Sequence, residues 1–523
     1  MERPHNQYIR PLLTDLYQIT MCYAYWKNGH HMDHAVFDAF FRKCPFKGEY
    51  TVFAGLSEVI EFLENFRFNQ EEVNYIRTLI PHAESEFFDW LLSIDASQLK
   101  VYAIPEGTLV FPRINLLRIE GPLAIAQLCE TTMLVLCNYA SLITTNAARF
   151  RKAAGKDKVM LEFGLRRAQG PDGAMTASKY SYLGGFDSTS NALAGMIYGI
   201  PVSGTHAHSY IASYVDYSDF RDRLIDGQDI LQLALDYRRE SGFTTNDGEL
   251  TAFASYAKAF PNAFLALVDT YDTLGSGIPN FLCVALALYK IGHKPVGIRL
   301  DSGDLAYLSI QARAMFKKTS EKFNVPFEDL KIVASNDINE TVIHSLNDQK
   351  HQIDVFGVGT NLVTCQSQPA LGMVYKLVEI REHPRIKLSN EKDKITIPCK
   401  KNAFRLFGES GEAICDVLMM SDEAEPQVGT RMLVRHPFDE RKRMFVVPSK
   451  VEKLHKLIWD GRLVEKIPSL SEGRERLQMQ IEAMRNDITR AINPTPYKIS
   501  LSSNLYDYLQ DLWNREVPIQ EFR

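Results

Sequence analysis

Residues 295–305 read PVGIRLDSGDL, an apolar run that reaches an arginine and then passes into a polar, glycine-containing loop. The apolar residues do not alternate with polar ones, which is typical of a strand covered on both faces of a parallel sheet. The loop 301–305 supplies serine and aspartate where the N-cap of a following helix would lie. This stretch therefore predicts one strand, one loop and one helix start of a parallel α/β fold.

The same rhythm recurs through the middle of the chain, from about residue 159 onward. Each apolar run passes into a polar turn, and helices are expected at 280–291, 305–323 and 339–348. The other runs are VMLEFGLRRAQG (159–170), IPVSGTHAHS (200–209), AFLALVDTYDT (263–273), KIVASNDI (331–338), DVFGVGTNLV (354–363) and LGMVYKLVEI (371–380). Repeated alternation of strand, loop and helix predicts a parallel α/β architecture.

Unusual polar residues gather at the predicted carboxyl ends of these strands. In a closed, TIM-like α/β barrel such ends converge on one rim, where these barrels carry out their chemistry. A doubly wound open sheet would also bind ligands at its carboxyl edge. The barrel is favoured because a closed ring brings contributions from many strands together more readily. The residues are Arg166, Arg167, Thr205, His208, Asp269, Arg299, Asp301, Asn336 and Thr360.

The two ends of the chain differ in character from its middle. Residues 1–150 mix a helix that begins near Thr14 and Asp15 with strand-like pieces. Residues 381–523 combine a charged stretch, strand-like pieces and an amphipathic helix around 472–492. We therefore expect an α/β barrel over 151–380 and a second α+β domain, in which 381–523 packs with 1–150.

The composition indicates an ordinary soluble enzyme. The chain has 523 residues, of which 45% are hydrophobic and 24% charged, and it is long enough to bury a large core. A net charge of −5 gives no bulk positive field for nucleic acid or an anionic membrane. The runs MLVLCNYASL and NFLCVALALY are too short to span a bilayer. Eight scattered cysteines without a C-x-x-C pattern are typical of reduced thiols, so we expect a cytosolic protein without nucleic-acid or membrane partners.

Two glycine-containing loops point to anion binding. In GVGTNLV (357–363) two glycines and a threonine follow a strand, and such a turn can present backbone N–H groups to a phosphate. The loop LDSGDL (300–305) has the same character. Each loop alone is also compatible with a plain turn or a helix N-cap, but two of them on one rim favour phosphate binding.

Three arginines stand on the same predicted rim. Arg299 ends an apolar strand, where a guanidinium needs a partner because burying it unpaired is costly. That partner is either a nearby acidic residue or the carboxylate or phosphate of a ligand, which the arginine fork suits. Arg166 and Arg167 add two more positive charges, and together the three favour an anionic ligand.

The segment GTHAHSY (204–210) carries two histidines one residue apart. In an extended segment both side chains would point the same way, so the two histidines could bind one metal ion. A barrel metallohydrolase needs further ligands, however, and none of the other histidines stands at a later strand end. A histidine that acts as a covalent nucleophile or as an acid/base needs no such ligands. A merely hydrogen-bonded loop histidine is the remaining alternative.

Several motifs occur in an order that resembles the nicotinate phosphoribosyltransferase family. They are PLLTDLYQITM (11–21), FGLRRAQGPDG (163–173), YLGGFDSTSN (182–191), GT-x-AHS (204–209), RLDSGDL (299–305) and GVGTNLVT (357–364). The resemblance implies transfer of a phosphoribosyl group from phosphoribosyl pyrophosphate to nicotinate, the entry step of NAD synthesis from nicotinic acid. It also implies ATP hydrolysis through a transient phosphohistidine, hence a ligase-type classification, and Mg²⁺ (or Mn²⁺) that accompanies the pyrophosphate group.

The resemblance further implies a type II phosphoribosyltransferase fold, an irregular α/β barrel with an α+β domain, and a homodimer with shared active sites. By position in the motifs, His208 corresponds to the phosphorylated histidine, and nothing is carried over to His206. The nicotinate contacts correspond to Tyr17, Thr205 and Arg299. The contacts to phosphoribosyl pyrophosphate correspond to Thr360, Gly359, Ser302, Gly303 and, as a phosphate clamp, Arg166.

Three other functions remain as alternatives. A phosphoribosyltransferase for nicotinamide or quinolinate is the nearest one, and Ala-His-Ser at 207–209, where nicotinamide-specific relatives would have Glu-His-Ser, favours nicotinate. A metal-dependent barrel hydrolase would explain the His-x-His pair. A scaffold that keeps the fold without catalysis is the third.

Overall fold

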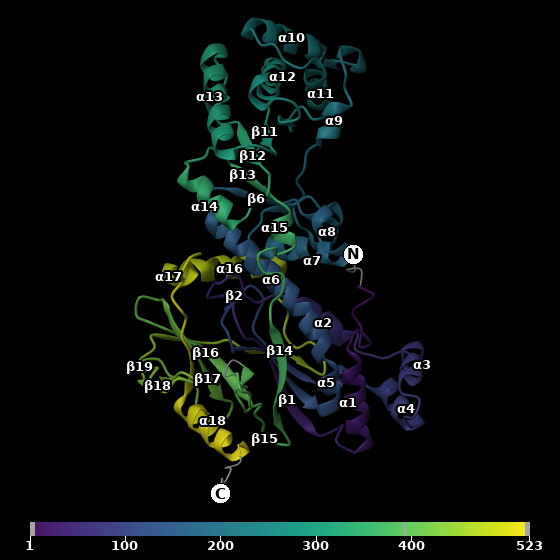
Figure 1. Ribbon diagram of the computed structural model, residues 1–523, viewed down its shortest axis with the longest axis vertical. Helices are drawn as coiled ribbons and strands as arrows, with labels where there is room; N and C mark the ends of the chain where they lie inside the picture. Colours follow the sequence, from purple (N-terminus) through teal and green to yellow (C-terminus); the bar gives the residue numbers. More distant parts are fainter. Residues whose placement is uncertain (1–5, 392–393, 518–523) are drawn as a thin grey trace. The chain divides into compact units, whose positions relative to one another are not determined.

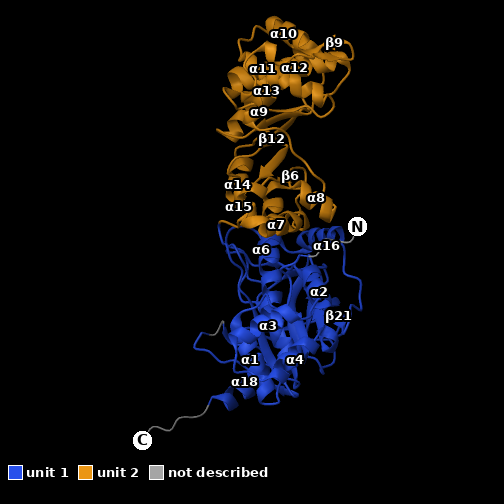
Figure 2. Ribbon diagram, turned by 90° about the vertical axis from the view of Figure 1, so that its right-hand side faces the viewer, with its two compact units in different colours: residues 1–146, 367–523 blue, residues 147–366 orange. Residues whose placement is uncertain are grey.

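The structure is a computed structural model that describes residues 6–391 and 394–517 (Figure 1). The chain divides into two compact units (Figure 2). One comprises residues 1–146 and 367–523 and thus contains both chain ends, and the other comprises residues 147–366. The unit boundaries fall at 146 and 366, where the sequence suggested 150 and 380.

Residues 147–366 are built on one parallel sheet of six strands. Its order is β10-β11-β12-β13-β6-β7, and every neighbouring pair is parallel. In Figure 1 the labels β11, β12, β13 and β6 follow one another in this order. The strands are β6 (Val159–Glu162), β7 (Ser188–Thr189), β10 (Leu265–Leu267), β11 (Gly297–Leu300), β12 (Lys331–Ala334) and β13 (Val355–Val358). The parallel α/β prediction is confirmed.

The sheet is not a fully hydrogen-bonded ring among the described strands, because β10 and β7 stand at its two ends. The segment 200–206 lies between these ends. Val202 forms a parallel bridge with Thr189 of β7, and the backbone N–H of Leu267 in β10 donates to Nε2 of His206 at 3.4 Å. Segment 200–206 thus contacts both end strands of a six-stranded parallel sheet that is open among the described strands.

The helices of this unit follow the strands as the sequence predicted. The expected helices at 280–291, 305–323 and 339–348 are α12 (Ile278–Ile291), α13 (Leu305–Phe323) and α14 (Glu340–Asp348). Asp304 and Asn339 cap α13 and α14 by accepting from backbone N–H groups three residues on. The other helices are α7 (Gly170–Leu183), α8 (Ala192–Tyr198), α9 (His208–Ala212), α10 (Ile230–Ser241), α11 (Asp247–Ala259), the π-helix η4 (Thr273–Gly277) and α15 (Thr360–Val363). A small hairpin of β8 (Leu224–Ile225) and β9 (Gln228–Asp229) precedes α10.

One strand expected in the barrel belongs to the other unit. The run 371–380 forms β14 (Met373–Ile380), which pairs antiparallel with β1 (His34–Phe41) over its whole length. Its apolar character predicted a strand correctly, although only Met373, Tyr375 and Val378 are buried, but assigning it to the parallel sheet was wrong. An apolar run marks a strand but does not say whether its neighbours run parallel or antiparallel, and every neighbouring pair in the sheet of β14 is antiparallel.

The unit of residues 1–146 and 367–523 contains two further six-stranded sheets. Their orders are β15-β14-β1-β5-β3-β21 and β19-β18-β22-β17-β16-β20. The remaining strands are β2 (Thr51–Val52), β3 (Lys100–Ala103), β4 (Leu109–Val110), β5 (Asn115–Pro122), β15 (His383–Pro384), β16 (Lys401–Phe407), β17 (Ala413–Met420), β18 (Met432–Arg435), β19 (Arg443–Val446), β20 (Lys450–Lys453), β21 (Lys456–Asp460) and β22 (Ile499–Ser502). The first sheet thus combines strands from both ends of the chain, and β5 at its centre is buried at every position.

The helices of this unit are α1 (Leu16–Lys27), α2 (Leu56–Glu64), α3 (Gln70–Leu79), α4 (Ser85–Ser93), α5 (Leu123–Leu128), the long α6 (Glu130–Ala154) that runs into the other unit, α16 (Leu470–Ala483), α17 (Asn486–Thr489) and α18 (Ser503–Glu516). Asp15 is the N-cap residue of α1, where the helix start was predicted. The single helix expected around 472–492 is two helices, because Met484 and Arg485 adopt extended backbone angles.

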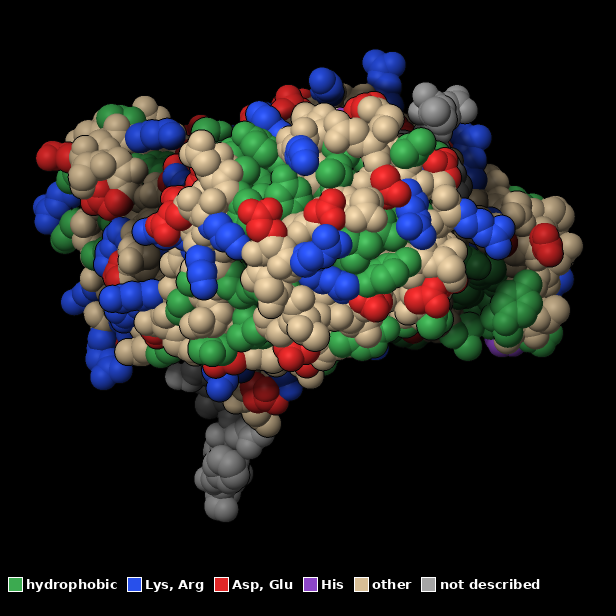
Figure 3. All heavy atoms as spheres, turned by 90° about the horizontal axis from the view of Figure 1, so that it is seen from above, with side chains coloured by type: hydrophobic (Ala, Val, Ile, Leu, Met, Phe, Trp, Pro, Cys, Tyr) green, Lys and Arg blue, Asp and Glu red, His purple; other side chains and the backbone are tan. Residues whose placement is uncertain are grey.

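Two helical stretches, Leu123–Ala154 and Thr273–Ile291, are long and apolar enough to cross a membrane by length and composition, which the shorter apolar runs in the sequence did not indicate. In the structure, 61% and 72% of their most apolar windows are buried inside the protein, as in core helices. On the face shown in Figure 3, lysine and arginine side chains are interspersed with aspartate and glutamate. That face therefore carries no field of a single sign.

Candidate functional site

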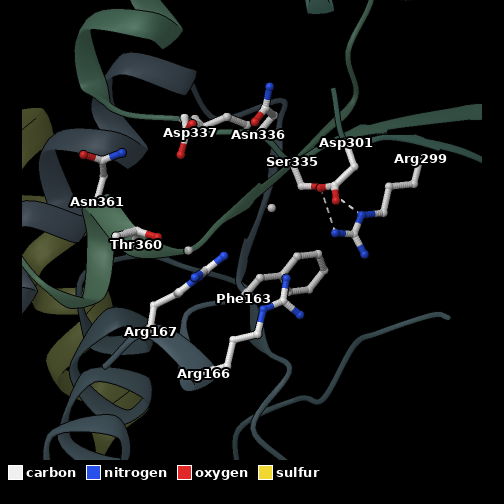
Figure 4. Close-up of a pocket in the computed structure, with 13 residues that line it drawn as sticks. Phe163, Arg166, Arg167, Arg299, Asp301, Ser335, Asn336, Asp337, Thr360 and Asn361 are labelled. Carbon is white, nitrogen blue, oxygen red and sulfur yellow. Dashed lines mark hydrogen bonds and ion pairs between the residues drawn. The ribbon is translucent and has the colours of Figure 1, made fainter. Parts of the chain in front are cut away.

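A cavity of about 140 Å³ lies at the carboxyl ends of β6, β11, β12 and β13 (Figure 4). These strands are neighbours in the sheet, so their loops meet at one edge although they are far apart in the sequence. The lining residues are Phe163, Arg166, Arg167, Arg299, Asp301, Ser335, Asn336, Asp337, Ile338, Gly357, Gly359, Thr360 and Asn361. Of the site residues expected from the sequence, the cavity brings together Arg166, Arg299, Gly359 and Thr360.

Arg166 and Arg167 enter the cavity from the short helical turn η2 (Leu165–Arg167) that follows β6. In Figure 4 both side chains extend into the cavity. Neither guanidinium hydrogen-bonds or ion-pairs with another residue in the described part of the chain, and both residues are exposed. Two positive charges without a protein partner on a concave surface form a receptor for an anion.

Arg299, at the end of β11, is held in place by two neighbours. Its Nε donates to Oγ of Ser335 at 2.7 Å, and its Nη2 donates to the carboxylate of Asp301 at 2.9 Å. The guanidinium also lies 5.2 Å from the ring centroid of Phe163. Within the described chain Nη1 makes no hydrogen bond, so the salt-bridge and ligand-clamp alternatives are compatible: Arg299 is anchored on one side and can bind an anion on the other.

Asp301 connects this arginine to the second histidine of the pair. The Asp301 carboxylate accepts from Arg299 and from Oγ of Ser335, and its Oδ2 lies 3.7 Å from Nε2 of His208. His208 is the first residue of α9, and its Nδ1 lies 3.1 Å from Oγ1 of Thr270. With its side chain 45% exposed, the imidazole is oriented by two neighbours and still accessible to a ligand.

His206 has a different environment, although it is only two residues away. Its Nε2 accepts from the backbone N–H of Leu267, and its ring lies edge-on to Tyr256 at 4.6 Å between centroids. Burial lowers the pKa of His206 to about 4, so the ring is neutral at neutral pH. The two imidazoles therefore do not face a common point: one anchors the segment to β10 and the other faces Asp301. No cluster of three or more metal-ligating side chains occurs among residues 6–391 and 394–517.

Five of the expected site residues lie outside the cavity lining: His208, described above, and Ser302, Gly303, Thr205 and Tyr17. Ser302 donates from Oγ to Asp269, and Gly303, with a φ of +79°, allows the turn that precedes α13. Thr205 is exposed on the segment before His208. Tyr17, 48% exposed, belongs to α1 in the unit that contains both chain ends.

Several lining residues were not singled out as site residues, among them Phe163, Ser335 and Asp337. Phe163 and Ser335 directly follow β6 and β12 and orient Arg299. Asp337 adopts a φ of +44°, an uncommon backbone conformation for a residue with a side chain. Their positions after strand ends were a usable signal, but a phenylalanine and a serine are too common in loops to attract notice.

Comparison with protein families gives three matches that together cover most of the chain. Residues 12–138 match the N-terminal domain of nicotinate phosphoribosyltransferase, residues 159–407 the nicotinate phosphoribosyltransferase family and residues 400–509 the C-terminal domain of the same enzyme. The nicotinate phosphoribosyltransferase of Dictyostelium discoideum is 55% identical over 536 residues, covering 100% of this chain and 91% of the relative. The one from Homo sapiens is 42% identical over 526 residues, covering 97% of this chain and 98% of the relative.

Solved structures agree with these matches. The crystal structure of human nicotinic acid phosphoribosyltransferase superposes with a TM-score of 0.87 at 41% identity, covering 95% of this chain and 99% of that one. The nicotinate-nucleotide pyrophosphorylase from Pyrococcus furiosus superposes with a TM-score of 0.60 at 21% identity, covering 92% of this chain and 98% of that one. The second likeness concerns the fold alone.

Proposed function

Because the chain belongs to the nicotinate phosphoribosyltransferase family, we propose that it transfers the phosphoribosyl group of phosphoribosyl pyrophosphate to nicotinate. The products are nicotinate mononucleotide and pyrophosphate, and the reaction is the first step of NAD synthesis from nicotinic acid. The observation that carries this proposal is the cavity at the strand ends, which Arg166 and Arg167 line together with Gly359 and Thr360 and in which neither guanidinium has a partner within the described chain.

This cavity suits the chemistry of the leaving group. As the bond to the anomeric carbon breaks, positive charge develops on the ribose and negative charge on the departing pyrophosphate. Fixed positive groups stabilise the developing negative charge without having to reorganise. Arg166 and Arg167 are the two guanidinium groups that the described part of the chain leaves unpaired in the cavity, so we assign the pyrophosphate to them.

Arg299 is suited to the carboxylate of nicotinate. Ser335 and Asp301 hold its Nε and Nη2, so the remaining edge of the guanidinium has one orientation. A carboxylate bound there would place the pyridine ring beside Phe163 and direct its nitrogen toward the sugar, which is a positioning effect. From the family resemblance we also propose Thr205 and Tyr17 as nicotinate contacts. In a homodimer, Tyr17 would contact the nicotinate bound in the partner subunit's site.

His208 is proposed as the residue that receives the γ-phosphoryl group of ATP. Its imidazole is exposed, oriented by Thr270 and faces the Asp301 carboxylate, which would stabilise positive charge on the ring during transfer. The reaction would then be ATP-coupled and of ligase type. A phosphoryl group on His208 would add roughly −1.5 to −2 charges beside the loop of Ser302 and Gly303, by analogy with other phosphorylated side chains.

A divalent cation is part of the proposal. Asp301 and Asp337 are the two carboxylates that line the cavity, and Mg²⁺ prefers carboxylate and phosphate oxygens. Mg²⁺ or Mn²⁺ bound there with the pyrophosphate would neutralise part of its charge.

Family membership also supports proposals about the barrel, the oligomeric state and the location of the protein. We propose that the open sheet together with segment 200–206 is the irregular barrel of this family, which the contacts of Val202 and His206 across the gap support. We also propose a homodimer with shared sites and a cytosolic location, which the eight free cysteines support.

A base-specificity assay tests the function directly. Purified protein is given phosphoribosyl pyrophosphate and Mg²⁺ with nicotinate, nicotinamide or quinolinate, each with and without ATP. We expect nicotinate mononucleotide to form and ATP to accelerate its formation. Turnover of nicotinamide or quinolinate alone would overturn the choice of base, and no turnover of any base would favour a scaffold.

A further inference from the structure

A buried carboxylate lies directly behind the arginine turn. Glu162 is the last residue of β6 and is 1% exposed. Its side chain accepts hydrogen bonds from the backbone N–H of Gly164, from Oγ of Ser178 at 2.9 Å and from Oγ1 of Thr189 at 2.5 Å. It does not line the cavity. Burying a carboxylate is costly unless donors surround it, and here three uncharged donors do so.

The first of these donors controls the turn that carries the arginines. Gly164 is the N-cap residue of η2, the turn that ends in Arg166 and Arg167. A Cβ on Gly164 would lie 2.2 Å from Cγ1 of Val363 on α15, so the turn is also pressed against the helix that begins at Thr360. The backbone of Gly164 is therefore held by Glu162 on one side and by Val363 of α15 on the other.

The donor Thr189 controls the segment that leads to the histidines. Thr189 belongs to β7, where its backbone N–H donates to the carbonyl of Pro201 and its carbonyl accepts from the N–H of Ser203, both at 3.0 Å. Its Oγ1 also accepts from the backbone N–H of Asn191 at 3.0 Å. Because residues 201–203 run directly into the Gly204–His208 stretch, the position of Thr189 sets the entry to that stretch.

The donor Ser178 connects the same carboxylate to helices α7 and α8. Ser178 lies on α7 and bonds Nδ2 of Asn191 at 3.2 Å, while Oδ1 of Asn191 caps α8. One carboxylate thus joins the start of the arginine turn, β7 and α7, with α8 one bond further away.

We propose that Glu162 is a positioning residue that holds the Arg166–Arg167 turn in the geometry that binds pyrophosphate, and keeps it in register with the His208 segment. Glu162 touches no substrate and acts through Gly164 and Thr189. The identity of the anion rests on the proposed function, whereas the role of Glu162 rests on the contacts described above.

The test replaces Glu162 by an isosteric amide. In Glu162→Gln the side chain keeps its volume, but its NH₂ group can no longer accept from whichever donors it faces. We expect the Kd for pyrophosphate with Mg²⁺, measured by isothermal titration calorimetry, to rise about tenfold, the effect of losing roughly one hydrogen bond to a charged group. The KM for phosphoribosyl pyrophosphate should rise by a similar factor, while the KM for nicotinate stays within about threefold of wild type.

A matched control separates positioning from stability. Glu106 is another buried carboxylate, in the unit with both chain ends, and accepts from the backbone N–H groups of Gly55 and Leu56 at 2.7 Å each. Glu106→Gln should lower Tm and leave the Kd for pyrophosphate unchanged. If Glu162→Gln also lowers Tm but binds pyrophosphate as wild type does, the proposal is wrong.

A second variant covers the case in which Glu162→Gln does not fold. Thr189→Val keeps the shape of the side chain and removes one donor, so it should raise the Kd for pyrophosphate in the same direction by a smaller factor. An unchanged Kd in a folded Thr189→Val protein would also contradict the proposal. If wild-type protein binds pyrophosphate but turns over no pyridine base, the proposed function fails, while the comparison of Kd values still decides the role of Glu162.

Discussion

At the scale of single residues, the two histidines of GTHAHSY show how neighbours in sequence acquire different chemistry. His206 is half-buried among aromatic rings and its Nε2 accepts from the backbone N–H of Leu267, so it anchors its segment to β10. His208 is partly exposed and lies between Thr270 and Asp301. The difference lies in the partners, which come from β10 and from the loop after β11, and not in the local sequence.

Replacing His208 tests its assignment. In His208→Ala, transfer of labelled γ-phosphate from ATP to the protein should disappear together with the ATP stimulation of product formation, because the proposed acceptor nitrogen is gone. The measurement is radiolabel on the protein after separation under alkaline conditions. His206→Gln, which can still accept from Leu267, should retain the label. Label on His208→Ala protein would show that the assignment within the pair is wrong.

Replacing Arg299 tests the nicotinate contact. A lysine cannot bond Ser335, Asp301 and a substrate carboxylate at once, because its ammonium is a single point rather than a planar fork. Arg299→Lys should therefore raise the KM for nicotinate by about tenfold or more, with a smaller change in the KM for phosphoribosyl pyrophosphate.

A second arginine of the same unit provides the control. Arg313 bonds Asp354 at 2.8 Å and the carbonyl of Leu330 at 2.7 Å, on α13 and away from the cavity lining. Arg313→Lys should leave both KM values unchanged. An equal rise in the KM for nicotinate in the two variants would mean that Arg299 acts only through stability.

At the scale of elements, apolar runs and caps predicted α12, α13 and α14 to within two residues at each end. The junction before α12 was not foreseen. There the chain forms the π-helix Thr273–Gly277, and Gly277 approaches β10 so closely that a Cβ on it would lie 1.8 Å from the carbonyl oxygen of Val268. A close backbone approach of this kind leaves only a glycine in the sequence as its sign.

Adding a methyl group at this junction should be destabilising. Gly277→Ala would force the start of α12 away from the end of β10, and we expect the free energy of unfolding to fall by about 2 kcal/mol, a typical cost of overpacking. Guanidinium denaturation followed by circular dichroism measures it. Gly173→Ala is the control, since α7 has room there, with the nearest atom at 3.8 Å, and the change should stabilise the helix by roughly 0.5–1 kcal/mol. Equal stability of the two variants would contradict the close approach.

At the scale of the whole molecule, stability should fall in acid because burial lowers the pKa of several histidines, most strongly those of His455 in one unit and of the half-buried His206 in the other. Burial lowers the pKa of His455 to about 3 and that of His206 to about 4, from an ordinary value of 6.5. Nδ1 of His455 accepts from the N–H of Ala403 at 3.2 Å, and its other nitrogen bonds the carbonyl of Asn115. In the unfolded chain these histidines bind a proton below pH 6.5, whereas in the folded protein they bind it only near pH 3 or 4. The free energy of unfolding therefore declines as the pH falls from 6.5 toward these lower values.

The contribution of His455 can be isolated. When the pH falls from 7 to 5, keeping His455 neutral should lower the free energy of unfolding by about 2 kcal/mol. The reason is that pH 5 lies 1.5 units below the unfolded pKa of 6.5, and each unit corresponds to about 1.4 kcal/mol. In His455→Gln, whose amide can keep both hydrogen bonds, the loss of unfolding free energy on going from pH 7 to pH 5 should be smaller by this amount. His206 is present in both proteins, so its effect cancels. An identical pH dependence of wild type and variant in guanidinium denaturation would show that His455 is not buried neutral.

The sequence by itself determined the parallel α/β character of residues 159–363, the edge of the sheet that carries the arginines, and the motifs that identify the family. These features are local: apolar runs report burial, and residues at strand ends must meet where parallel strands end together. A helix cap or a glycine turn can likewise be predicted from a few neighbouring residues, because its hydrogen bonds are formed within that short segment.

Only the tertiary structure decided which side chains face one another. Thr270 is 62 residues from His208 along the chain, and the three donors around Glu162 come from different elements. For the same reason β14 joined the antiparallel sheet of β1, and Ser302 bonded Asp269 instead of lining the cavity. A hydrogen bond acts over about 3 Å and depends on direction, so it is set by packing across the whole unit rather than by spacing in the sequence.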